Sequence, residues 1–303
     1  MALLFVTILW GCTFVWMKQA LDAAERALGR PAGLAVIAFY IAVRFSVAAG
    51  VLALWPRARA GLDRGAWRGG GILGGILFVG FVLQMRGLSG VTPSVSAFLT
   101  SLYVVFAALL TFWMHRHRPH APFLVGALLA TLGAGFIEGP PNLTFGSAEW
   151  LTIASAAIFA VHILATDRLT KVNPPLAVSL AMFVCMAAFA ILALPVALRH
   201  PQAPAFKELL ALFDHAAFVI PLSFTTLFAT LVALTLMNLY QRELDPLRAA
   251  ILYALEPIWT TLFAFVIGFG RPGFWLWVGG GALVAGNLIA EWGAARDEGS
   301  ERP

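Results

Sequence analysis

The chain has 303 residues, of which 60% are hydrophobic and only 12% charged, and its mean hydropathy is +0.86. A soluble domain carries about 25% charged residues, so this composition excludes an ordinary soluble protein and indicates one that crosses a membrane several times. The formal net charge is +5. Because the Lys and Arg residues lie mainly between apolar segments, they set orientation in the membrane and give no support to a nucleic-acid partner. Cys12 and Cys185 both lie in apolar segments, which argues against a disulfide framework.

Apolar runs long enough to cross a bilayer follow one another along the chain. A transmembrane helix needs roughly 20 apolar residues, and the first run begins at Met1 without the basic region or cleavage site of a signal peptide. We therefore expect an all-α, multi-pass membrane protein with ten transmembrane helices and no soluble domain. The ten runs are residues 2–20, 32–55, 69–86, 94–114, 121–138, 148–167, 175–197, 216–240, 246–267 and 273–292.

The connectors between these runs predict the orientation of the chain. With both termini inside the cell, the cytoplasmic side holds 12 Lys and Arg residues and the outer side holds 7. This bias favours cytoplasmic N- and C-termini. We expect the protein in the cell inner membrane. The longest connector, about residues 198–215, predicts a short helix in the membrane interface. Residues 293–303 form a polar tail that we expect on the cytoplasmic side.

The second half of the chain repeats the first. A shift of 153 residues aligns, without a gap, two prolines, two glycines, an arginine and a glutamate with identical residues. We therefore predict two repeats of five helices each, residues 1–138 and 148–292. Because five is odd, the second repeat enters the membrane from the opposite side, and inverted repeats build secondary transporters that open a midplane site to each side in turn. The first-half members of the six identical pairs are Pro93, Arg118, Pro119, Gly126, Gly133 and Glu138.

Several short motifs also resemble a known family. They are LWGCTF at residues 9–14, VRF at 43–45, PSVSAFL at 93–99 and LEP at 255–257. At these positions the chain is similar to the EamA-type permeases of the drug/metabolite transporter superfamily, and the resemblance covers essentially the whole chain. It implies a ten-helix carrier of amino acids, metabolites or drugs, with the substrate cavity between the two halves and with peripheral fifth and tenth helices.

Glu256 and Pro257 stand in the middle of an apolar run, where both are unfavourable in lipid. A chain retains such a pair only where the helix faces other protein or a water-filled cavity. Because burial disfavours the charged form of a carboxyl group, we hypothesise that Glu256 couples transport to protons or binds an amine of the solute. The alternative is a neutral acid that fixes helix packing. Pro257 predicts a helix kink. In the first repeat, Tyr103 and Val104 occupy the positions equivalent to Glu256 and Pro257, so we expect the acid and the kink in the second half only.

Arg44 and His162 are the other ionisable residues near mid-helix. An unpaired guanidinium is very costly in the membrane and cannot deprotonate, so we expect Arg44 to bind an anionic group of the solute or an acid such as Glu256. A histidine changes charge near neutral pH, which suits a proton relay, although a lone histidine on an apolar helix more often forms an interhelical hydrogen bond, and this is the alternative for His162. Further candidates for the cavity wall, whose aromatic members can instead serve packing or an interfacial belt, are Trp10, Trp16, Gln84, Tyr103, Asn238, Tyr240 and Tyr253.

The third run carries Gly70, Gly71, Gly74 and Gly75, which form two overlapping Gly-x-x-x-Gly spacings. Small residues at this spacing let two membrane helices approach closely. We therefore expect a close helix contact along this run, of the kind that rocking halves need.

Two other classes of membrane protein fit parts of the sequence. Residues 87–90 read Gly-Leu-Ser-Gly, a pattern of intramembrane serine proteases, with Ser89 as nucleophile and His162 as base. Ser89 lies past the end of its run rather than in mid-membrane, so we expect a carrier and not an enzyme. A pore repeats charged or carbonyl-rich rings, and no connector resembles a filter.

The sequence also limits the partners of the protein. No Walker pattern is present, so we do not expect ATP to drive transport directly. We also expect no cofactor, metal or nucleic acid, since no motif in the sequence supports one. The expected partners are a small-molecule substrate, the lipid bilayer and protons as a candidate coupling ion. We expect a monomer or a weak homodimer.

Overall fold

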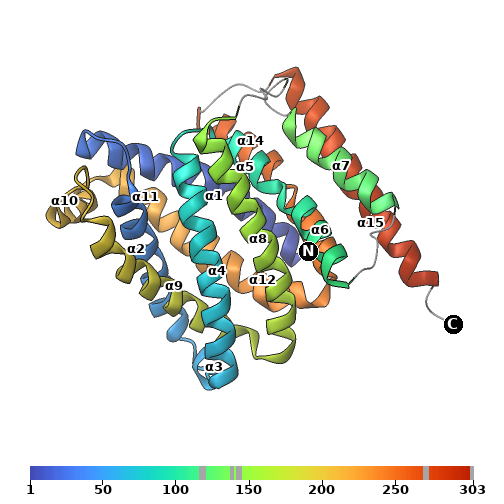
Figure 1. The fold of residues 1–303 in the computed structure, drawn as a ribbon, viewed down its shortest axis with the longest axis horizontal. Coiled ribbons are helices and arrows are strands. Elements are labelled where there is room, and N and C mark those ends of the chain that lie inside the picture. The colour runs from blue at the N-terminus through green and yellow to red at the C-terminus, as the bar shows by residue number, and fades with distance from the viewer. Residues whose placement is uncertain (116–120, 137–139, 141–144, 269–272, 301–303) are drawn as a thin grey trace.

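Helices are the only regular secondary structure in the part of the chain that is described (Figure 1). The structure is a computed structural model, and it describes residues 1–115, 121–136, 140, 145–268 and 273–300. Of the repeat positions, Arg118, Pro119, Glu138, Arg271 and Pro272 lie outside these ranges. In chain order the elements are α1 (Ala2–Leu28), α2 (Leu34–Ala53), α3 (Pro56–Ala60), α4 (Arg64–Leu88), α5 (Pro93–Ser101), α6 (Tyr103–His115), α7 (Ala121–Gly135), α8 (Ser147–Val172), α9 (Pro175–Ala197), α10 (Phe206–Ala211), η1 (Leu212–Asp214), α11 (Ala216–Phe224), η2 (Thr225–Leu234), α12 (Thr235–Tyr240), η3 (Gln241–Glu243), α13 (Pro246–Tyr253), α14 (Glu256–Val266) and α15 (Phe274–Ser300).

The predicted all-α membrane architecture is confirmed. Within the described residues, eight helical stretches are long and apolar enough to cross a membrane, and they coincide with the first four runs and with the sixth to ninth. The fifth and tenth runs form shorter apolar helices, Ala121–Gly135 and Phe274–Ala290. The number of ten transmembrane helices therefore stays a prediction.

Some helices extend beyond the apolar runs that predicted them. α1 continues through polar residues, where Lys18 and Asp22 form an i,i+4 ion pair of 3.3 Å, and it stops where Gly29 adopts the left-handed conformation at a φ of 64°. α15 likewise continues to Ser300, through most of the predicted polar tail. Hydropathy marks the apolar part of a helix, but backbone hydrogen bonding continues in polar surroundings until a capping residue ends it.

The fourth and ninth of the ten predicted apolar runs are each broken into two helices. α13 ends at Tyr253 and α14 begins at Glu256, with Pro257 in the first turn of α14, where a missing N–H group is tolerated. α5 ends at Ser101 and α6 begins at Tyr103, without a proline. The expectation that only the second half is interrupted is therefore wrong.

The break in the first half has its own local cause. The Oγ atom of Ser101 donates a hydrogen bond of 2.7 Å to the carbonyl group of Phe98, and such bonds compete with the helical backbone pattern. The N–H group of Leu102 then donates to the carbonyl group of Thr100, two residues earlier. A serine and a tight turn thus interrupt the first half where a proline interrupts the second.

A π-helical segment interrupts the helix that forms the eighth predicted apolar run, residues 216–240. This segment is η2, between α11 and α12. The Oγ1 atom of Thr230 donates to the carbonyl group of Thr225, five residues earlier, over 3.1 Å. Tyr40 of α2 shares a hydrogen bond of 2.5 Å with the hydroxyl group of Thr225. Because π-helical turns are rare and concentrate at functional sites, η2 is a candidate part of the functional site.

α7 and α15 lie side by side at one edge of the molecule (Figure 1). A Cβ atom on Gly126 would lie 2.5 Å from the carbonyl oxygen of Gly286, and one on Gly133 would lie 2.6 Å from that of Gly279. Gly279 and Gly286 are the repeat counterparts of Gly126 and Gly133, so each glycine contacts the counterpart of the other. Reciprocal contacts are what a two-fold axis requires, and they support the predicted inverted repeat.

The glycines of α4 divide into two pairs. A Cβ atom on Gly70 would lie 2.4 Å from the Cβ atom of Ala181, and one on Gly74 would lie 3.1 Å from α9. A Cβ atom on Gly71 or Gly75 would meet nothing closer than 3.7 Å. The predicted close contact is therefore confirmed for one of the two spacings, and its partner is α9.

Connectors that the prediction places on one side of the membrane lie together. Arg30, after α1, donates to Glu208 of α10 over 2.9 Å, and Arg86 of α4 donates to the α1–α2 connector. At the opposite side, Gly61 after α3 packs against Pro174 before α9. α10 confirms the short helix in the longest connector, and its location in the membrane interface stays a prediction.

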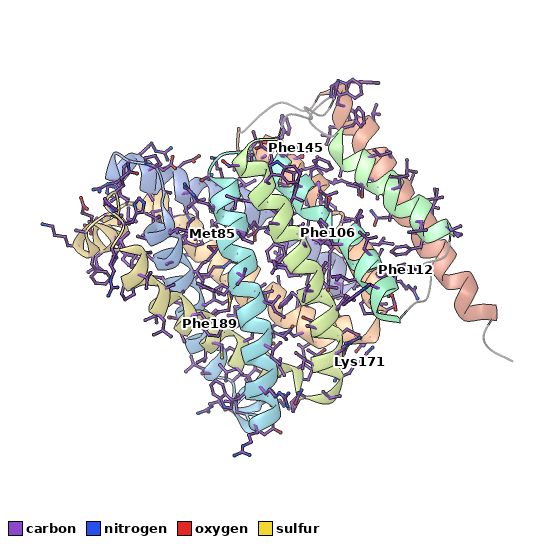
Figure 2. All side chains as sticks on the ribbon, in the orientation of Figure 1. Met85, Phe106, Phe112, Phe145, Lys171 and Phe189 are labelled. Atoms are coloured by element: carbon purple, nitrogen blue, oxygen red, sulfur yellow. The ribbon has the colours of Figure 1, made fainter. Side chains whose placement is uncertain are left out.

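Large apolar side chains cover the outside of the helices (Figure 2). Phe112 of α6 is 43% exposed and Phe189 of α9 is 37% exposed, whereas Met85 of α4 is buried. Lipid tails are as apolar as these side chains, so their exposure carries no cost in a bilayer. The outer surface is the surface of a membrane-embedded bundle.

Candidate functional site

A cavity lies between the two halves, with an empty volume of about 570 Å³ that includes space open to solvent. Its wall is mainly apolar, with polar side chains at a few positions, as in sites for small organic molecules. The cavity is lined by Trp10, Thr13, Phe14, Met17, Arg44, Leu77, Phe81, Gln84, Thr100, Tyr103, Phe159, His162, Ile163, Leu234, Met237, Tyr253 and Glu256.

About half of these residues come in pairs that the repeat relates. The shift of 153 residues gives four pairs. A cavity walled by equivalent positions of two repeats lies between them, on the axis that relates them. The pairs are Phe81 with Leu234, Gln84 with Met237, Thr100 with Tyr253, and Tyr103 with Glu256.

Tyr103 and Glu256 mark the axis itself. The phenol group of Tyr103 donates a hydrogen bond of 3.4 Å to Oε1 of Glu256, its counterpart 153 residues later. Two positions that a two-fold axis exchanges can touch only at the axis. Each is also the first residue of a helix that follows a break, α6 or α14. The buried carboxyl group of Glu256 therefore lies close to the axis that relates the two repeats.

α14 is held closely against α1. The hydroxyl group of Thr260 donates to the carbonyl group of Gly11 over 3.0 Å. A Cβ atom on Gly11 would lie 2.5 Å from the Cβ atom of Trp259, so only glycine permits this approach. Gly11 belongs to the LWGCTF motif, and its packing role could not be predicted from that motif.

Tyr253 connects the cavity wall to a buried polar chain. Its hydroxyl group donates to Oε1 of Gln241 over 3.2 Å, and Nε2 of Gln241 donates to the carbonyl group of Ile163 over 2.8 Å. The ring of Trp10 meets that of Tyr253 edge to face at a centroid distance of 5.1 Å. The tyrosine is thus fixed in place from both sides.

Arg44 lines the cavity but is not paired with Glu256. Its Nε atom donates to the hydroxyl group of Thr230 in η2, and no ion pair joins it to any described carboxylate. The salt bridge with Glu256 that we considered is therefore not formed in this structure. Contact with the solute, the other expectation for Arg44, stays a prediction.

His162 and Gln84 supply two more polar groups. The Nε2 atom of His162 is buried and has no hydrogen-bond partner among the described residues. The Nε2 atom of Gln84 donates to the hydroxyl group of Thr100 over 3.4 Å. The interhelical hydrogen bond that offered an alternative role for His162 is not formed by Nε2.

Four predicted site residues do not line the cavity. Trp16 packs against aromatic rings of η2 and its neighbours, the nearest being Phe224 at a centroid distance of 5.4 Å. Asn238 is buried and donates to Oγ of Ser179 over 2.9 Å. Tyr240, the last residue of α12, is 41% exposed, and Pro257 is buried in the first turn of α14.

Ser89, the candidate nucleophile of the protease alternative, caps the end of α4. Its hydroxyl group donates to the carbonyl group of Arg86 over 2.8 Å. It does not line the cavity that holds His162. The two residues therefore do not share a site.

Several lining residues were not predicted, and the repeat could have found some of them. Thr100 is the counterpart of Tyr253, and Met237 is the counterpart of Gln84. Transferring each candidate by 153 residues would have added both. The remaining unpredicted lining residues are Thr13, Phe14, Met17, Leu77, Phe81, Phe159, Ile163 and Leu234.

Metal-ligating side chains do not gather within the described residues. No group of three or more His, Cys, Asp or Glu side chains there has the arrangement of a metal site. The chemistry of the cavity therefore rests on its hydrogen-bonding and charged groups.

Comparisons with known proteins agree with this architecture. The model of the EamA-like transporter family matches residues 1–138 and 146–291, once in each half. An uncharacterized transporter of Archaeoglobus fulgidus is 25% identical over 271 residues, which cover 88% of this chain and 77% of that protein. A solved structure described only as "Crystal structure of protein" is similar with a TM-score of 0.64 and 20% identity, covering 96% of this chain and 98% of that one. This last similarity shows the fold alone.

Proposed function

The chain belongs to the EamA-like transporter family, and on that premise we propose that it is a secondary carrier that moves a small organic solute by alternating access. That it is a membrane transporter and not an enzyme follows from the family and from the transporter that resembles it. The observation that carries the mechanism is the cavity on the two-fold axis, whose wall is built from equivalent positions of both halves.

The inverted repeat supports alternating access. When two inverted halves rock about an axial site, each can in turn adopt the conformation of the other, so that the site opens to one side and then to the opposite side. The breaks at Leu102 and at Ala254–Leu255 lie beside the cavity. Such ends of helices absorb changes in backbone angles, so we assign the two breaks as hinges.

The composition of the wall favours a solute with an apolar body and few polar groups. Aromatic rings such as those of Trp10, Phe81 and Phe159 face the same space as the side chains of Gln84 and His162. An amino acid, a metabolite or a drug of this kind is the substrate that we propose.

Glu256 is the proposed proton-coupling group. It is buried, it lies on the axis and its carboxyl group has one hydrogen-bond partner, Tyr103, among the described residues. A carboxyl group at the axis can exchange a proton with either side as the halves rock. The transported solute and the proton would then use the same central position in turn.

The orientation proposed here places both termini in the cytoplasm of a cell with an inner membrane. The excess of Lys and Arg on that side supports it. We also propose a monomer or a weak homodimer, because the charged connectors and the central cavity need no second chain to complete them.

Flux measurements test the proposal. Metabolite profiles of media from deletion and overexpression strains would first identify solutes whose export depends on the protein. Uptake of such a solute into proteoliposomes is then expected to saturate with concentration and to show counterflow. Flux that rises linearly without counterflow would instead indicate a pore.

A further inference from the structure

Arg44 is the largest fully buried side chain of the described residues, with 1% of its surface exposed. It lies in the middle of α2, and it lines the same cavity as Glu256 and His162. A guanidinium group stays protonated in proteins. A fixed positive charge therefore faces the central cavity.

The contacts of this guanidinium are neutral. Nε donates to the hydroxyl group of Thr230, and Nη1 lies 3.6 Å from Sδ of Met17. The ring centroids of Phe81 and Phe45 lie 4.8 Å and 5.5 Å from its Cζ atom. Aromatic faces attract a cation, but none of these groups carries a negative charge.

The charge lacks a counter-ion within the described residues. No ion pair there includes Arg44, and its Nη2 atom makes no hydrogen bond to a described residue. A buried charge is normally paired, because removal from water is unfavourable unless an opposite charge compensates it. No described carboxylate of the wall is paired with Arg44, and the side chain faces the cavity.

We propose that Arg44 forms a subsite for an anionic group, a carboxylate, of the transported solute. The planar guanidinium can donate two parallel hydrogen bonds to a carboxylate, and Nη2 is available for one of them. The rest of the wall, with rings such as Phe14 and Phe159, suits an apolar body. The subsite thus selects amphipathic carboxylates, and this selection rests on the carrier function proposed above.

The structure offers a matched control on the same helix. Tyr40 lies one turn before Arg44, bonds Thr225 of the same π-helical segment and does not line the cavity. Tyr40→Phe removes one hydrogen bond between α2 and η2 and changes no charge. It therefore separates a loss of this contact from a loss of the positive charge.

Binding is tested with three probes that share one apolar body: hydrocinnamate, its neutral amide and phenylpropylamine. The thermal unfolding of the purified protein in detergent is measured with each probe near pH 7. We expect hydrocinnamate alone to raise the midpoint. Arg44→Gln should weaken its binding about tenfold or more, with a smaller loss in Arg44→Lys and none in Tyr40→Phe.

The outcomes separate the subsite from the carrier function. Equal stabilisation by the three probes, or by none, overturns the subsite, and so does an Arg44→Gln protein that prefers hydrocinnamate as the wild type does. If Arg44→Gln fails to fold, the subsite is tested by comparing how strongly hydrocinnamate stabilises the wild-type protein and the Arg44→Lys variant, relative to the amide and the amine. If proteoliposomes take up the amide or the amine saturably, but not hydrocinnamate, the carrier function is supported and the carboxylate subsite at Arg44 is rejected. Stabilisation by hydrocinnamate with no saturable flux of any probe would keep the subsite and reject the carrier.

Discussion

At the centre of the molecule, two residues that occupy the same position in the two repeats, Tyr103 and Glu256, are joined by a hydrogen bond of 3.4 Å. The two positions are equivalent in the repeat, but their chemistry differs, since one half supplies a phenol group and the other a carboxyl group. Arg44 and His162 add to this asymmetry from α2 and α8. The shape of the cavity thus follows the repeat, while its charges are set by single residues.

The role of Glu256 is tested by Glu256→Gln. Glutamine keeps the size and the hydrogen-bonding capacity of the side chain but cannot take up or release a proton. We expect the variant to lose solute accumulation driven by a pH gradient and to retain solute exchange without a gradient, measured in proteoliposomes. Tyr103→Phe is the control, since it removes the hydrogen bond and leaves the acid, and pH dependence should persist. A variant whose transport matches the wild type at every pH would rule out proton coupling at Glu256.

The independence of Arg44 and Glu256 gives a second prediction. Because no ion pair joins them, the stability loss in the double variant Arg44→Gln, Glu256→Gln should equal the sum of the two single losses to within about 0.5 kcal/mol. Chemical or thermal unfolding in one detergent gives all four values. A double variant that is much more stable than this sum would show that the two charges interact directly.

At the scale of helices, close contacts depend on individual glycines rather than on a general pattern. α4 presents Gly70 and Gly74 to α9, and the neighbouring Gly71 and Gly75 have ordinary spacing. α1 approaches α14 at Gly11, beside the break that precedes Glu256. These contacts fix the helices that carry the cavity wall.

The adjacent glycines of α4 allow a matched test. Gly70→Ala would place a Cβ atom 2.4 Å from Ala181 and 2.6 Å from a backbone nitrogen of α9, so we expect a loss of about 1–3 kcal/mol from overpacking. Gly71→Ala would place it 3.9 Å from the nearest atom, and alanine is the better helix former. The thermal midpoint should therefore fall in the first variant and stay level or rise in the second. Equal midpoints would contradict the assigned contact between α4 and α9.

At the scale of the whole molecule, a two-fold axis relates the two repeats. The reciprocal glycine contacts of α7 with α15, the contact of Tyr103 with Glu256 and the paired lining of the cavity all refer to it. An axis in the membrane plane relates one side of the membrane to the other. In the carrier that we propose, this relation lets a single central site serve both sides of the membrane.

The orientation of the whole molecule is tested by accessibility. In a background with Cys12 and Cys185 replaced by alanine, Ala60→Cys probes α3 and Gln202→Cys probes the connector before α10, both at exposed positions. A membrane-impermeant maleimide should label the cysteine at position 202 in intact spheroplasts and that at position 60 only after lysis. The reverse pattern would show that the chain is inserted with its termini outside.

Much of the fold could be predicted from the sequence. Membrane embedding, the approximate helices and the inverted repeat are one-dimensional properties, since they depend on the length of apolar runs and on identical residues at a constant shift. Glu256, Arg44 and His162 could be predicted as site residues because an ionisable group is unfavourable in an apolar run unless it has a function or a partner. All three line the cavity.

The partners of these residues could not be predicted in the same way. Lipid and protein interior are both apolar, so the hydrophobic pattern of a membrane helix does not show which face is buried. Trp16 and Asn238 therefore looked as suitable for the cavity as Tyr253, although only Tyr253 lines it. The first-half break also escaped prediction, because Ser101 is a weaker signal than proline.

By itself, the sequence determined that this protein is a membrane-embedded chain of two repeats, which we predict to be inverted, with a few costly ionisable residues at mid-helix. Only the tertiary structure decided that the repeats enclose one cavity on their axis and that Arg44 faces it without a counter-ion. The physical reason is that apolar length and repetition act along the chain, whereas the pairing of a buried charge depends on which helices surround it.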